Sequence, residues 1–363
     1  MSGAAETILV RSVNWLGDAV MSTPALMRLR EARPEARLTL LSPEKLAGLW
    51  EGQRFVDEVM TFSREESLWE VSRRLRARKF GRGLALPNSM RSALELWLAR
   101  IAVRVGAGRG GRGLFLTRVV APRPGGFEMR KRSPREIRRL ISGGGESRPI
   151  PAAAHHVHHY LRLAGALGAS SEPLAPRIEV GEEEVAAARL KFGLTQSEGR
   201  PWFGLNPGAE YGPAKRWPAE RFTVAAVALG KTLNCRWVIF GGPAEVELGG
   251  SIARDLGQGT GEPAVNLAGQ TSLRELAATL KVCDWVLTND SGPMHLAAAV
   301  GSRVAAIFGS TSPELTGPIF SPGARIVRQP VACSPCFLRE CPIDLRCLRG
   351  IQAQQVVEAV LGG

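Results

Sequence analysis

Residues 7–41 read TILVRSVNWLGDAVMSTPALMRLREARPEARLTLL. The apolar run at 7–13 predicts a buried strand, and a polar turn follows it as far as Asp18. Apolar residues then recur at helical spacing from Pro24 onward, and a second apolar run at 37–41 predicts the next strand. A strand, a helix and a strand in this order form a unit whose two strands are parallel. The stretch therefore predicts an α/β fold.

The same alternation continues along the chain and begins again in its second half. Six further short apolar runs predict strands, at residues 83–87, 202–205, 236–240, 264–267, 285–288 and 304–308. A Pro- and Glu-containing stretch near 170–184 separates the two series. A chain of 363 residues has the length of about two domains. We therefore predict two doubly wound parallel domains, at 1–180 and 181–363, with a cleft between them and a last helix that could pack back on the N-terminal domain.

The composition indicates a basic globular protein. Lys and Arg number 47 against 34 Asp and Glu, which gives a net charge of +13 and suggests an anionic partner. Candidate partners are nucleic acid, a phosphorylated glycolipid and an anionic membrane face. Only 6% of residues are aromatic and no helix-turn-helix pattern is present, which argues against nucleic acid. No apolar run reaches the roughly 18 residues of a membrane span, so we expect a cytoplasmic protein.

One basic segment stands apart from the α/β pattern. Residues 104–149 are rich in Gly, Arg and Lys, with GAGRGGRG near the start and MRKRSPREIRRL later. The segment fits a solvated loop region and an anion-binding surface equally well. It lacks the helix and the acidic residue that would make it a dinucleotide-binding fingerprint.

The first polar cluster directly follows the first predicted strand. It contains Asn14, Trp15, Gly17 and Asp18. Ligands of open α/β sheets bind at the carboxyl ends of the strands, so a carboxylate here is placed to act as a general base. Asp18 could instead cap the following helix. Gly17 allows a ligand to approach the backbone closely.

A second cluster follows the strand predicted at 202–205. It contains Asn206 and Gly208 in a Gly/Pro loop, followed by Lys215 and Arg216 before a helix. Backbone amides together with a lysine at a helix start suit a phosphate or diphosphate. An ordinary surface loop with exposed basic residues is the alternative.

A third cluster follows the strand predicted at 285–288. Asp290 can accept a sugar hydroxyl, while Ser291 and Gly292 lead into a helix whose first amides attract a phosphate. His295 lies in the first turn of that helix. A ribose could also be bound by an acidic residue after the strand at 236–240, where the candidates are Glu245 and Glu247.

The metal-binding patterns of the chain are limited. Asp-x-Asp, the spacing of a metal-chelated diphosphate site, does not occur. Cys333 and Cys336 form a Cys-x2-Cys pair, followed by Cys341 and Cys347. These four cysteines are a candidate structural zinc site, although the last two do not form a second tight pair.

Together and in this order, the clusters resemble the ADP-heptose:lipopolysaccharide heptosyltransferases. These are inverting glycosyltransferases of family 9, and the heptosyltransferase II branch is the most similar. The matching motifs are NWLGDAVMSTP at 14–24, NPGA and KRWP within 206–218, NDSGPMH at 289–295, FGSTSP at 308–313 and CSPC at 333–336. Each motif is modest alone, but their order is specific and covers nearly the whole chain. The basic segment at 104–149 matches least.

The resemblance implies a GT-B fold with two Rossmann-like domains, and a transfer of heptose from ADP-L-glycero-D-manno-heptose to the lipopolysaccharide inner core. It implies an acceptor on the N-terminal half, where Asp18 would be the general base beside Asn14, Trp15 and Gly17. The C-terminal half would bind ADP-heptose, with Lys215 neutralising the departing diphosphate. It further implies no cofactor or catalytic metal, a phosphorylated lipid A core as acceptor, and peripheral contact with the inner face of the membrane. The predicted donor site comprises Asn206, Gly208, Lys215, Arg216, Glu245, Glu247, Asp290, Ser291, Gly292 and His295.

Two other readings of the sequence remain open. One is a GT-B glycosyltransferase that uses a different nucleotide sugar, which competition between donors would reveal. The other is a non-catalytic module that binds a nucleotide or a glycolipid, in which case substitution of Asp18 would have no effect. A nicotinamide oxidoreductase is disfavoured, because no dinucleotide fingerprint follows the first strand.

Overall fold

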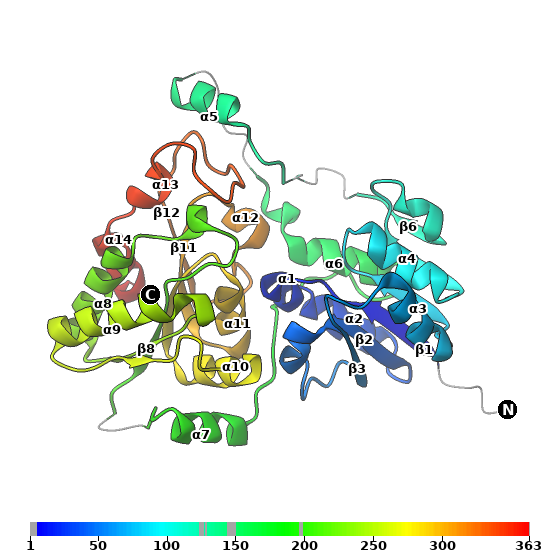
Figure 1. Cartoon of the computed structure of the whole chain (residues 1–363), viewed down its shortest axis with the longest axis horizontal. Helices are drawn as coiled ribbons and strands as arrows, with labels where there is room; N and C mark the ends of the chain where they lie inside the picture. Colours follow the sequence, from blue (N-terminus) through cyan, green and yellow to red (C-terminus); the bar gives the residue numbers. More distant parts are fainter. Residues whose placement is uncertain (1–5, 123–126, 128, 144–149, 196–198, 363) are drawn as a thin grey trace. The chain divides into compact units, whose positions relative to one another are not determined.

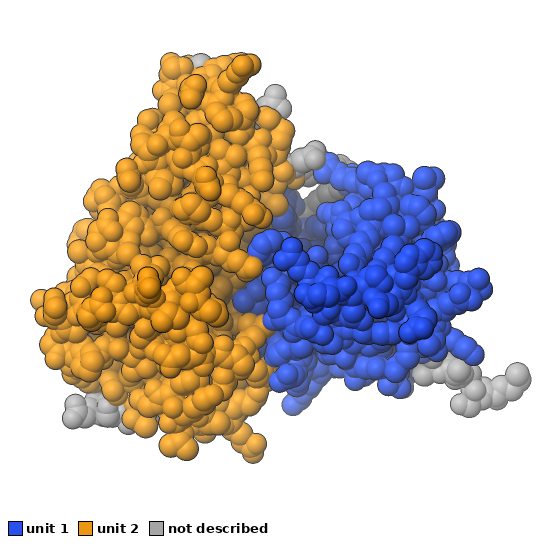
Figure 2. Space-filling model, viewed as in Figure 1, with its two compact units in different colours: residues 1–126, 153–179 blue, residues 127–152, 180–363 orange. Residues whose placement is uncertain are grey.

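The computed structural model describes residues 6–122, 127, 129–143, 150–195 and 199–362. The chain forms two compact units, which Figure 2 distinguishes by colour. Unit 1 comprises residues 1–126 and 153–179, and unit 2 comprises residues 127–152 and 180–363. The last change of unit, between residues 179 and 180, falls one residue from the boundary expected at 180/181. Residues 127–152, which we expected in the N-terminal domain, group with unit 2.

Unit 1 is built on a sheet of six parallel strands in the order β3-β2-β1-β4-β5-β6 (Figure 1). The strands are β1 (Thr7–Arg11), β2 (Arg37–Pro43), β3 (Glu58–Phe62), β4 (Arg82–Ala85), β5 (Val103–Ala107) and β6 (Arg118–Val120). In the central strand β1, Ile8, Leu9 and Val10 are fully buried, as expected where both faces of a parallel sheet are covered. The direction of winding reverses between β1 and β4. Open α/β sheets bind their ligands at this point.

Helices connect the strands of unit 1, and the last of them, α6, lies close to the end of β1. They are α1 (Leu16–Met21), α2 (Thr23–Ala32), α3 (Leu68–Ala77), α4 (Met90–Leu98) and α6 (His156–Gly165), with 3-10 helices η1 (Glu44–Leu49), η2 (Arg112–Phe115) and η3 (Ala152–Ala154), of which the last straddles the unit boundary. A capping box between Ser67 and Glu70 starts α3, and Ser89 caps α4. α6 contacts both α1 and α2. This packing places α6 beside the polar turn that follows β1.

Unit 2 repeats the same strand order. Its parallel sheet runs β9-β8-β7-β10-β11-β12. With β7 counted as the first strand, this is the strand order of unit 1. The strands are β7 (Trp202–Asn206), β8 (Arg236–Ile239), β9 (Val265–Asn266), β10 (Trp285–Asn289), β11 (Arg303–Phe308) and β12 (Ala324–Arg328). The winding reverses between β7 and β10, so the loops that follow these two strands form the expected ligand-binding end.

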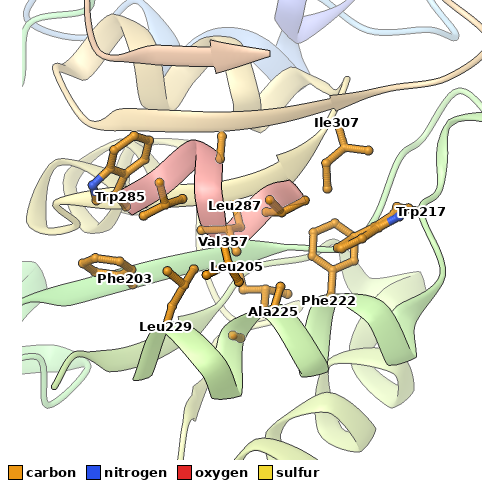
Figure 3. Packing of buried hydrophobic residues seen from close by; sticks show 14 of the residues in the cluster. Phe203, Leu205, Trp217, Phe222, Ala225, Leu229, Trp285, Leu287, Ile307 and Val357 are labelled. Atoms are coloured by element: carbon orange, nitrogen blue, oxygen red, sulfur yellow. The ribbon is translucent and has the colours of Figure 1, made fainter. Parts of the chain in front are cut away.

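The helices of unit 2 are α5 (Pro134–Ile141), α7 (Glu182–Lys191), α8 (Ala219–Leu233), α9 (Val246–Thr260), α10 (Leu273–Val282), α11 (Gly292–Val300), α12 (Pro313–Thr316), α13 (Arg346–Arg349) and α14 (Ala353–Leu361), with short 3-10 turns η4 (Pro213–Lys215) and η5 (Pro243–Glu245). Helices α8, α9 and α14 bury a large apolar core against the sheet. Figure 3 shows Phe222 and Leu229 of α8 pointing toward Phe203 and Leu205 of β7. Each large apolar side chain buried in this way contributes about 1.5–3 kcal/mol. The last helix, α14, packs on α8, β11 and β12 of its own unit.

The structure confirms the α/β class and the two doubly wound parallel sheets. It also contains strands β3, β5, β6 and β12, which we did not predict. β6 and all but the first residue of β5 lie within the basic stretch at 104–149, so the first part of that stretch completes the sheet of unit 1. Residues 123–126, 128 and 144–149 of the stretch lie outside the described residues. No helix in the described part of the chain is long and apolar enough to cross a membrane.

Candidate functional site

The turn after β1 is held by a buried ion pair. Arg11, the last residue of β1, is only 2% exposed, and its Nε lies 2.8 Å from Oε2 of the fully buried Glu95 on α4. A guanidinium NH group of Arg11 also donates a hydrogen bond to Asn14 Oδ1 at 3.3 Å. Breaking a buried ion pair leaves an uncompensated charge and is strongly destabilising, so these contacts fix the start of the turn. Arg11 therefore orients Asn14 at the carboxyl end of the sheet.

Asp18 lies in the first turn of α1 and is contacted by two residues of α6. The Tyr160 hydroxyl donates a hydrogen bond of 2.9 Å to Asp18 Oδ1, and His156 Nδ1 lies 3.5 Å from the same oxygen. Burial, the Asp18 charge and this hydrogen bond raise the pKa of Tyr160 well above its usual value, so the phenol keeps its proton. The Asp18 side chain remains 30% exposed. It is thus a held carboxylate that solvent or a ligand can still reach.

His159 of α6 and Arg112 of η2 are two further polar side chains of unit 1. His159 is neutral at pH 7, because burial first, and then the charges of His156, Arg112 and Arg162, lower its pKa to about 4. Arg112, only 4% exposed, donates to Asn88 Oδ1 at 3.0 Å and to the carbonyl of Ala107. The hydrogen-bond partners found for Arg112 among the described residues are neutral oxygens.

The other residues predicted on this side occupy the same turn. Trp15 is the N-cap residue of α1 and is 43% exposed, with Lys45 Nζ located 5.1 Å from its ring centroid. Gly17 lies within α1 and is partly buried. We did not assign roles to Tyr160, His156 or Arg112 from the sequence. Residues 155–159, which read HHVHH, directly precede Tyr160, but a run of histidines does not by itself indicate a neighbour 142 residues away.

In unit 2, two asparagines connect the loops that follow β7 and β10. Asn206 Nδ2 donates to the hydroxyls of Thr288 at 3.2 Å and Ser291 at 3.1 Å. Asn289 Nδ2 donates to the Pro207 carbonyl at 2.6 Å, and its Oδ1 accepts from the Trp217 amide at 2.9 Å. These bonds hold both ends of the Gly/Pro loop against the next strand end. We predicted a role for Asn206 but missed the positioning role of Asn289.

The structure brings Lys215 and Asp290 together as an ion pair. Lys215 Nζ lies 2.6 Å from Asp290 Oδ2, and the side chains are 15% and 3% exposed. The Thr311 hydroxyl donates to the same oxygen at 2.5 Å. Burial alone would raise the pKa of Asp290, but the charge and hydrogen bond of Lys215, the Thr311 bond and the His295 charge together lower it. Asp290 is therefore a buried anion that holds Lys215 at the ligand-binding end.

The N-terminus of α11 lies next to this pair in the sequence. Ser291 is the N-cap, the helix starts at Gly292, and a proline occupies one of its first two positions. The first amides of a helix have no intrahelical acceptor, so they carry partial positive charge and attract anions. His295, in the first turn, is 7% exposed and contributes to the lowered pKa of Asp290. Lys215 and the start of α11 thus offer positive charge near the end of the same sheet.

Glu245 packs against Gly208, which explains the need for glycine in this loop. A Cβ atom added to Gly208 would lie 1.7 Å from Glu245 Oε1. The other carboxylate oxygen of Glu245 accepts from the Gly242 amide at 2.8 Å. Glu247 lies exposed in the first turn of α9, while the Arg216 guanidinium donates to the Ala209 carbonyl at 3.1 Å. Glu245 is thus beside the predicted phosphate-binding loop, whereas the Arg216 side chain forms a hydrogen bond with the backbone of that loop.

The four C-terminal cysteines surround one small cavity. Cys333, Cys336, Cys341 and Cys347 line a space of about 20 Å³. The Leu345 amide donates to Cys341 Sγ at 3.3 Å. Burial raises the pKa of Cys347 to about 12, and the neighbouring thiols add to the shift. Among the described residues, no group of three His, Cys, Asp or Glu side chains is arranged to hold a metal ion.

Comparisons with known proteins identify relatives of this chain. The profile of glycosyltransferase family 9 (heptosyltransferase) matches residues 145–346. Lipopolysaccharide heptosyltransferase 2 of Escherichia coli is 31% identical over 334 residues, which cover 88% of this chain and 87% of the relative. The structure of E. coli ADP-heptose lps heptosyltransferase II matches with a TM-score of 0.77 at 28% identity and covers 98% of both chains. A family 9 glycosyl transferase from Veillonella parvula matches with a TM-score of 0.72 at 25% identity, over 90% of this chain and 87% of the other.

The order of the motifs, the two doubly wound sheets and these matches lead to one assignment. The match to a curated relative extends over most of both chains, and the profile match covers more than half of this chain. The chain therefore belongs to glycosyltransferase family 9, the heptosyltransferases, and has the GT-B fold.

Proposed function

We propose that the enzyme transfers heptose from ADP-heptose to the inner core of lipopolysaccharide, as a heptosyltransferase II. The observation that carries the proposal is a carboxylate near the ligand-binding end of one sheet and a lysine near that of the other. Unit 1 holds the Asp18 carboxylate with Tyr160 and His156. Unit 2 holds Lys215 at the sheet end from which α11 starts. A base for an acceptor hydroxyl and a cation for a diphosphate are the two groups that the transfer requires.

In the proposed reaction, Asp18 accepts the proton of the acceptor hydroxyl. The hydroxyl oxygen forms a bond to the anomeric carbon of heptose as the bond from that carbon to the diphosphate oxygen breaks. This single displacement inverts the anomeric configuration and releases ADP. The hydrogen bond from Tyr160 fixes the direction of the carboxylate, and fixed geometry of this kind is a large part of general base catalysis.

The departing diphosphate carries negative charge that unit 2 is suited to stabilise. Lys215 and the amides at the start of α11 would meet that charge as it develops. Because Asp290 holds the lysine from a buried position, the cation is already in place before the reaction. Ser291, Gly292 and His295 would bind the diphosphate and heptose, and Glu245 beside Gly208 would accept hydrogen bonds from the ribose hydroxyls of ADP.

The acceptor side of unit 1 fits a phosphorylated sugar. Arg112 provides a buried positive charge near His159, and Lys45 lies beside the exposed ring of Trp15. Sugar rings stack on exposed aromatic faces, while guanidinium groups bind phosphate in a fixed fork geometry. We propose that the acceptor is a phosphorylated lipid A core and that the enzyme meets it as a cytoplasmic, peripheral protein at the inner face of the membrane.

The test of this proposal is ADP release by purified protein. We expect ADP only when ADP-heptose and a lipid A core with one heptose are both present, and no release from Asp18→Ala. Release with UDP- or GDP-sugars but not with ADP-heptose would overturn the donor assignment. Binding of ADP-heptose without release on any heptose-deficient core would overturn the acceptor assignment.

Replacement of Tyr160 by Phe should separate orientation of the base from donor binding. We expect kcat to fall about tenfold, because a hydrogen bond to a charged group contributes roughly 1.5–3 kcal/mol. The KM for ADP-heptose should not change, since the predicted donor residues are on the other sheet. Tyr160 is only 5% exposed and phenylalanine keeps its ring, so circular dichroism should remain that of the wild type. An unchanged kcat would contradict the orienting role.

Replacement of Gly208 by Ala should weaken donor binding without unfolding the protein. The new Cβ would displace the Glu245 carboxylate, which is the mobile end of a side chain. We expect the KM for ADP-heptose to rise about tenfold, because a displaced hydrogen-bonding carboxylate forfeits roughly 1.5 kcal/mol. Gly257→Ala is the matched control: it lies within α9, and its Cβ would meet no atom closer than 3.7 Å. The control should leave KM unchanged, and equal effects of both variants would contradict a specific role for Gly208.

A further inference from the structure

Residues 129–143 are one part of the longer basic stretch at 104–149, and the name basic segment is used for this part alone from here on. They lie on the surface of unit 2 and take no part in the proposed reaction. The segment contains six Lys or Arg residues and one acidic residue, Glu136. Its central element is α5, which Ser133 caps by accepting a hydrogen bond from the Glu136 amide at 3.2 Å. Figure 1 shows α5 at an outer end of unit 2, beyond α13.

One side of the basic segment is fastened to unit 2. Ile137 is 1% exposed and packs with Cys333 and Cys336 in a small apolar cluster. The Arg132 amide donates to the Cys336 carbonyl at 3.0 Å, and the Arg132 side chain donates to the Ala332 carbonyl at 3.1 Å. These contacts determine which side of α5 faces the protein and which side faces solvent.

The solvent side of the segment is almost uniformly cationic. Its exposed cations are Arg130, Lys131, Arg135, Arg138 and Arg139. The one carboxylate of the segment, on Glu136, is paired with Arg130 at 2.7 Å. Like charges gathered on one exposed side repel one another, and an anionic partner would offset that repulsion.

Two apolar residues, which Glu128 separates in the sequence, are exposed immediately before these cations. Met129 is 46% exposed and Phe127 is 36% exposed. The Phe127 ring lies 6.3 Å from the ring of Phe337, which holds it on unit 2. Exposed apolar groups beside a row of cations are typical of protein segments that lie in the interface of a bilayer.

We propose that the basic segment is a docking surface for an anionic lipid bilayer. The arginines would bind lipid phosphates, while Met129 and Phe127 would enter the boundary between headgroups and acyl chains. A nucleic acid would match the charge but would offer no apolar layer for these two side chains. The inference deepens the proposed function, since it rests on a lipid-linked acceptor, and it names the surface that would contact the membrane.

The experiment is vesicle flotation of the full chain at low salt. One set of vesicles is pure phosphatidylcholine, and the other contains a quarter phosphatidylglycerol. The test variant is Arg135→Gln/Arg138→Gln/Arg139→Gln, on the exposed side of α5. The matched control is Arg64→Gln/Arg73→Gln/Arg76→Gln, which removes the same charge from exposed positions in unit 1. Transfer to a delipidated, soluble acceptor is measured for all three proteins.

We expect the wild type to bind only the anionic vesicles. The test variant should lose affinity on the order of 100-fold, as three basic residues near an anionic surface predict, and the control should lose less than about threefold. Equal loss in both variants would overturn the proposal, because attraction would then come from net charge alone. Tighter binding of a structured RNA than of the anionic vesicles would overturn it in favour of a nucleic-acid surface.

The soluble acceptor distinguishes this proposal from the proposed function. If the enzyme transfers heptose to that acceptor but the test variant binds vesicles like the wild type, the docking surface is wrong and the function stands. If vesicle binding depends on the basic segment but no donor supports transfer, the function is wrong and the docking surface stands.

Discussion

We expect Asp18→Asn to lower kcat for heptose transfer by about 10²–10⁴-fold, the usual contribution of a general base. The amide has the shape of the carboxylate but cannot accept the acceptor proton. Tyr160 can still donate to the remaining carbonyl oxygen, so the turn after β1 should stay in place. Affinity for ADP-heptose, measured by calorimetry, should remain within about twofold of the wild type, because the predicted donor residues belong to unit 2. A twofold change corresponds to less than about 0.5 kcal/mol of binding free energy.

The control for this substitution is Asp255→Asn on the exposed side of α9. It removes the same charge from an exposed residue that is not among the predicted site residues, and it should leave both kcat and affinity unchanged. A normal turnover of Asp18→Asn would remove the base assignment. A parallel loss of donor affinity would instead show that Asp18 acts through binding rather than through proton transfer.

We expect Lys215→Ala to lower kcat by about 10²–10³-fold, as loss of one group that stabilises developing negative charge does. The same substitution should also lower the free energy of unfolding by roughly 3 kcal/mol, because it leaves Asp290 buried at 3% exposure without its cation. Chemical denaturation measures the second effect, and steady-state ADP release measures the first.

The double variant Lys215→Ala/Asp290→Asn separates these two effects. Removing both charges should restore most of the free energy of unfolding, since no buried charge is left unpaired. It should not restore turnover, because the cation for the diphosphate is still missing. A double variant with both stability and turnover restored would show that Lys215 has only a structural role.

The stability effect should also depend on pH. In the wild type, the pKa of Asp290 is lowered from its ordinary value of 3.8. Its ionised form therefore stabilises the fold above about pH 4, and this contribution is lost as the pH falls through the lowered pKa. In Lys215→Ala, burial is opposed only by the Thr311 bond and His295, so the pKa of Asp290 should rise. The stability difference between the two proteins should then narrow between pH 7 and pH 4.

Much of the fold could be predicted because its signals are local. The central strands β1, β7 and β10 are short apolar runs, and each is followed by a polar turn and a helix. The strands that we missed carry charged residues or lie at sheet edges, as β6 (Arg118–Val120) and β12 (Ala324–Arg328) do. An edge strand is covered less completely than a central one, so its sequence shows less of the apolar pattern.

The candidate site was only partly predictable, because its polar partners come from distant parts of the chain. Lys215 and Asp290 are 75 residues apart, and each was predicted as a separate ligand contact. Neither residue's local sequence shows that the two form a buried ion pair. The pairing results from the strand order, which places β7 next to β10 and brings their two loops together.

The sequence by itself determined the α/β class, the two series of strands and the polar turns at the strand ends, because periodicity and turn chemistry act over a few residues. Only the tertiary structure decided which side chains hold Asp18. α6 packs against α1 and α2, and that packing brings Tyr160 and His156 to a carboxylate about 140 residues earlier in the chain. Such contacts depend on how helices pack on a finished sheet, and no local pattern in the sequence records that packing.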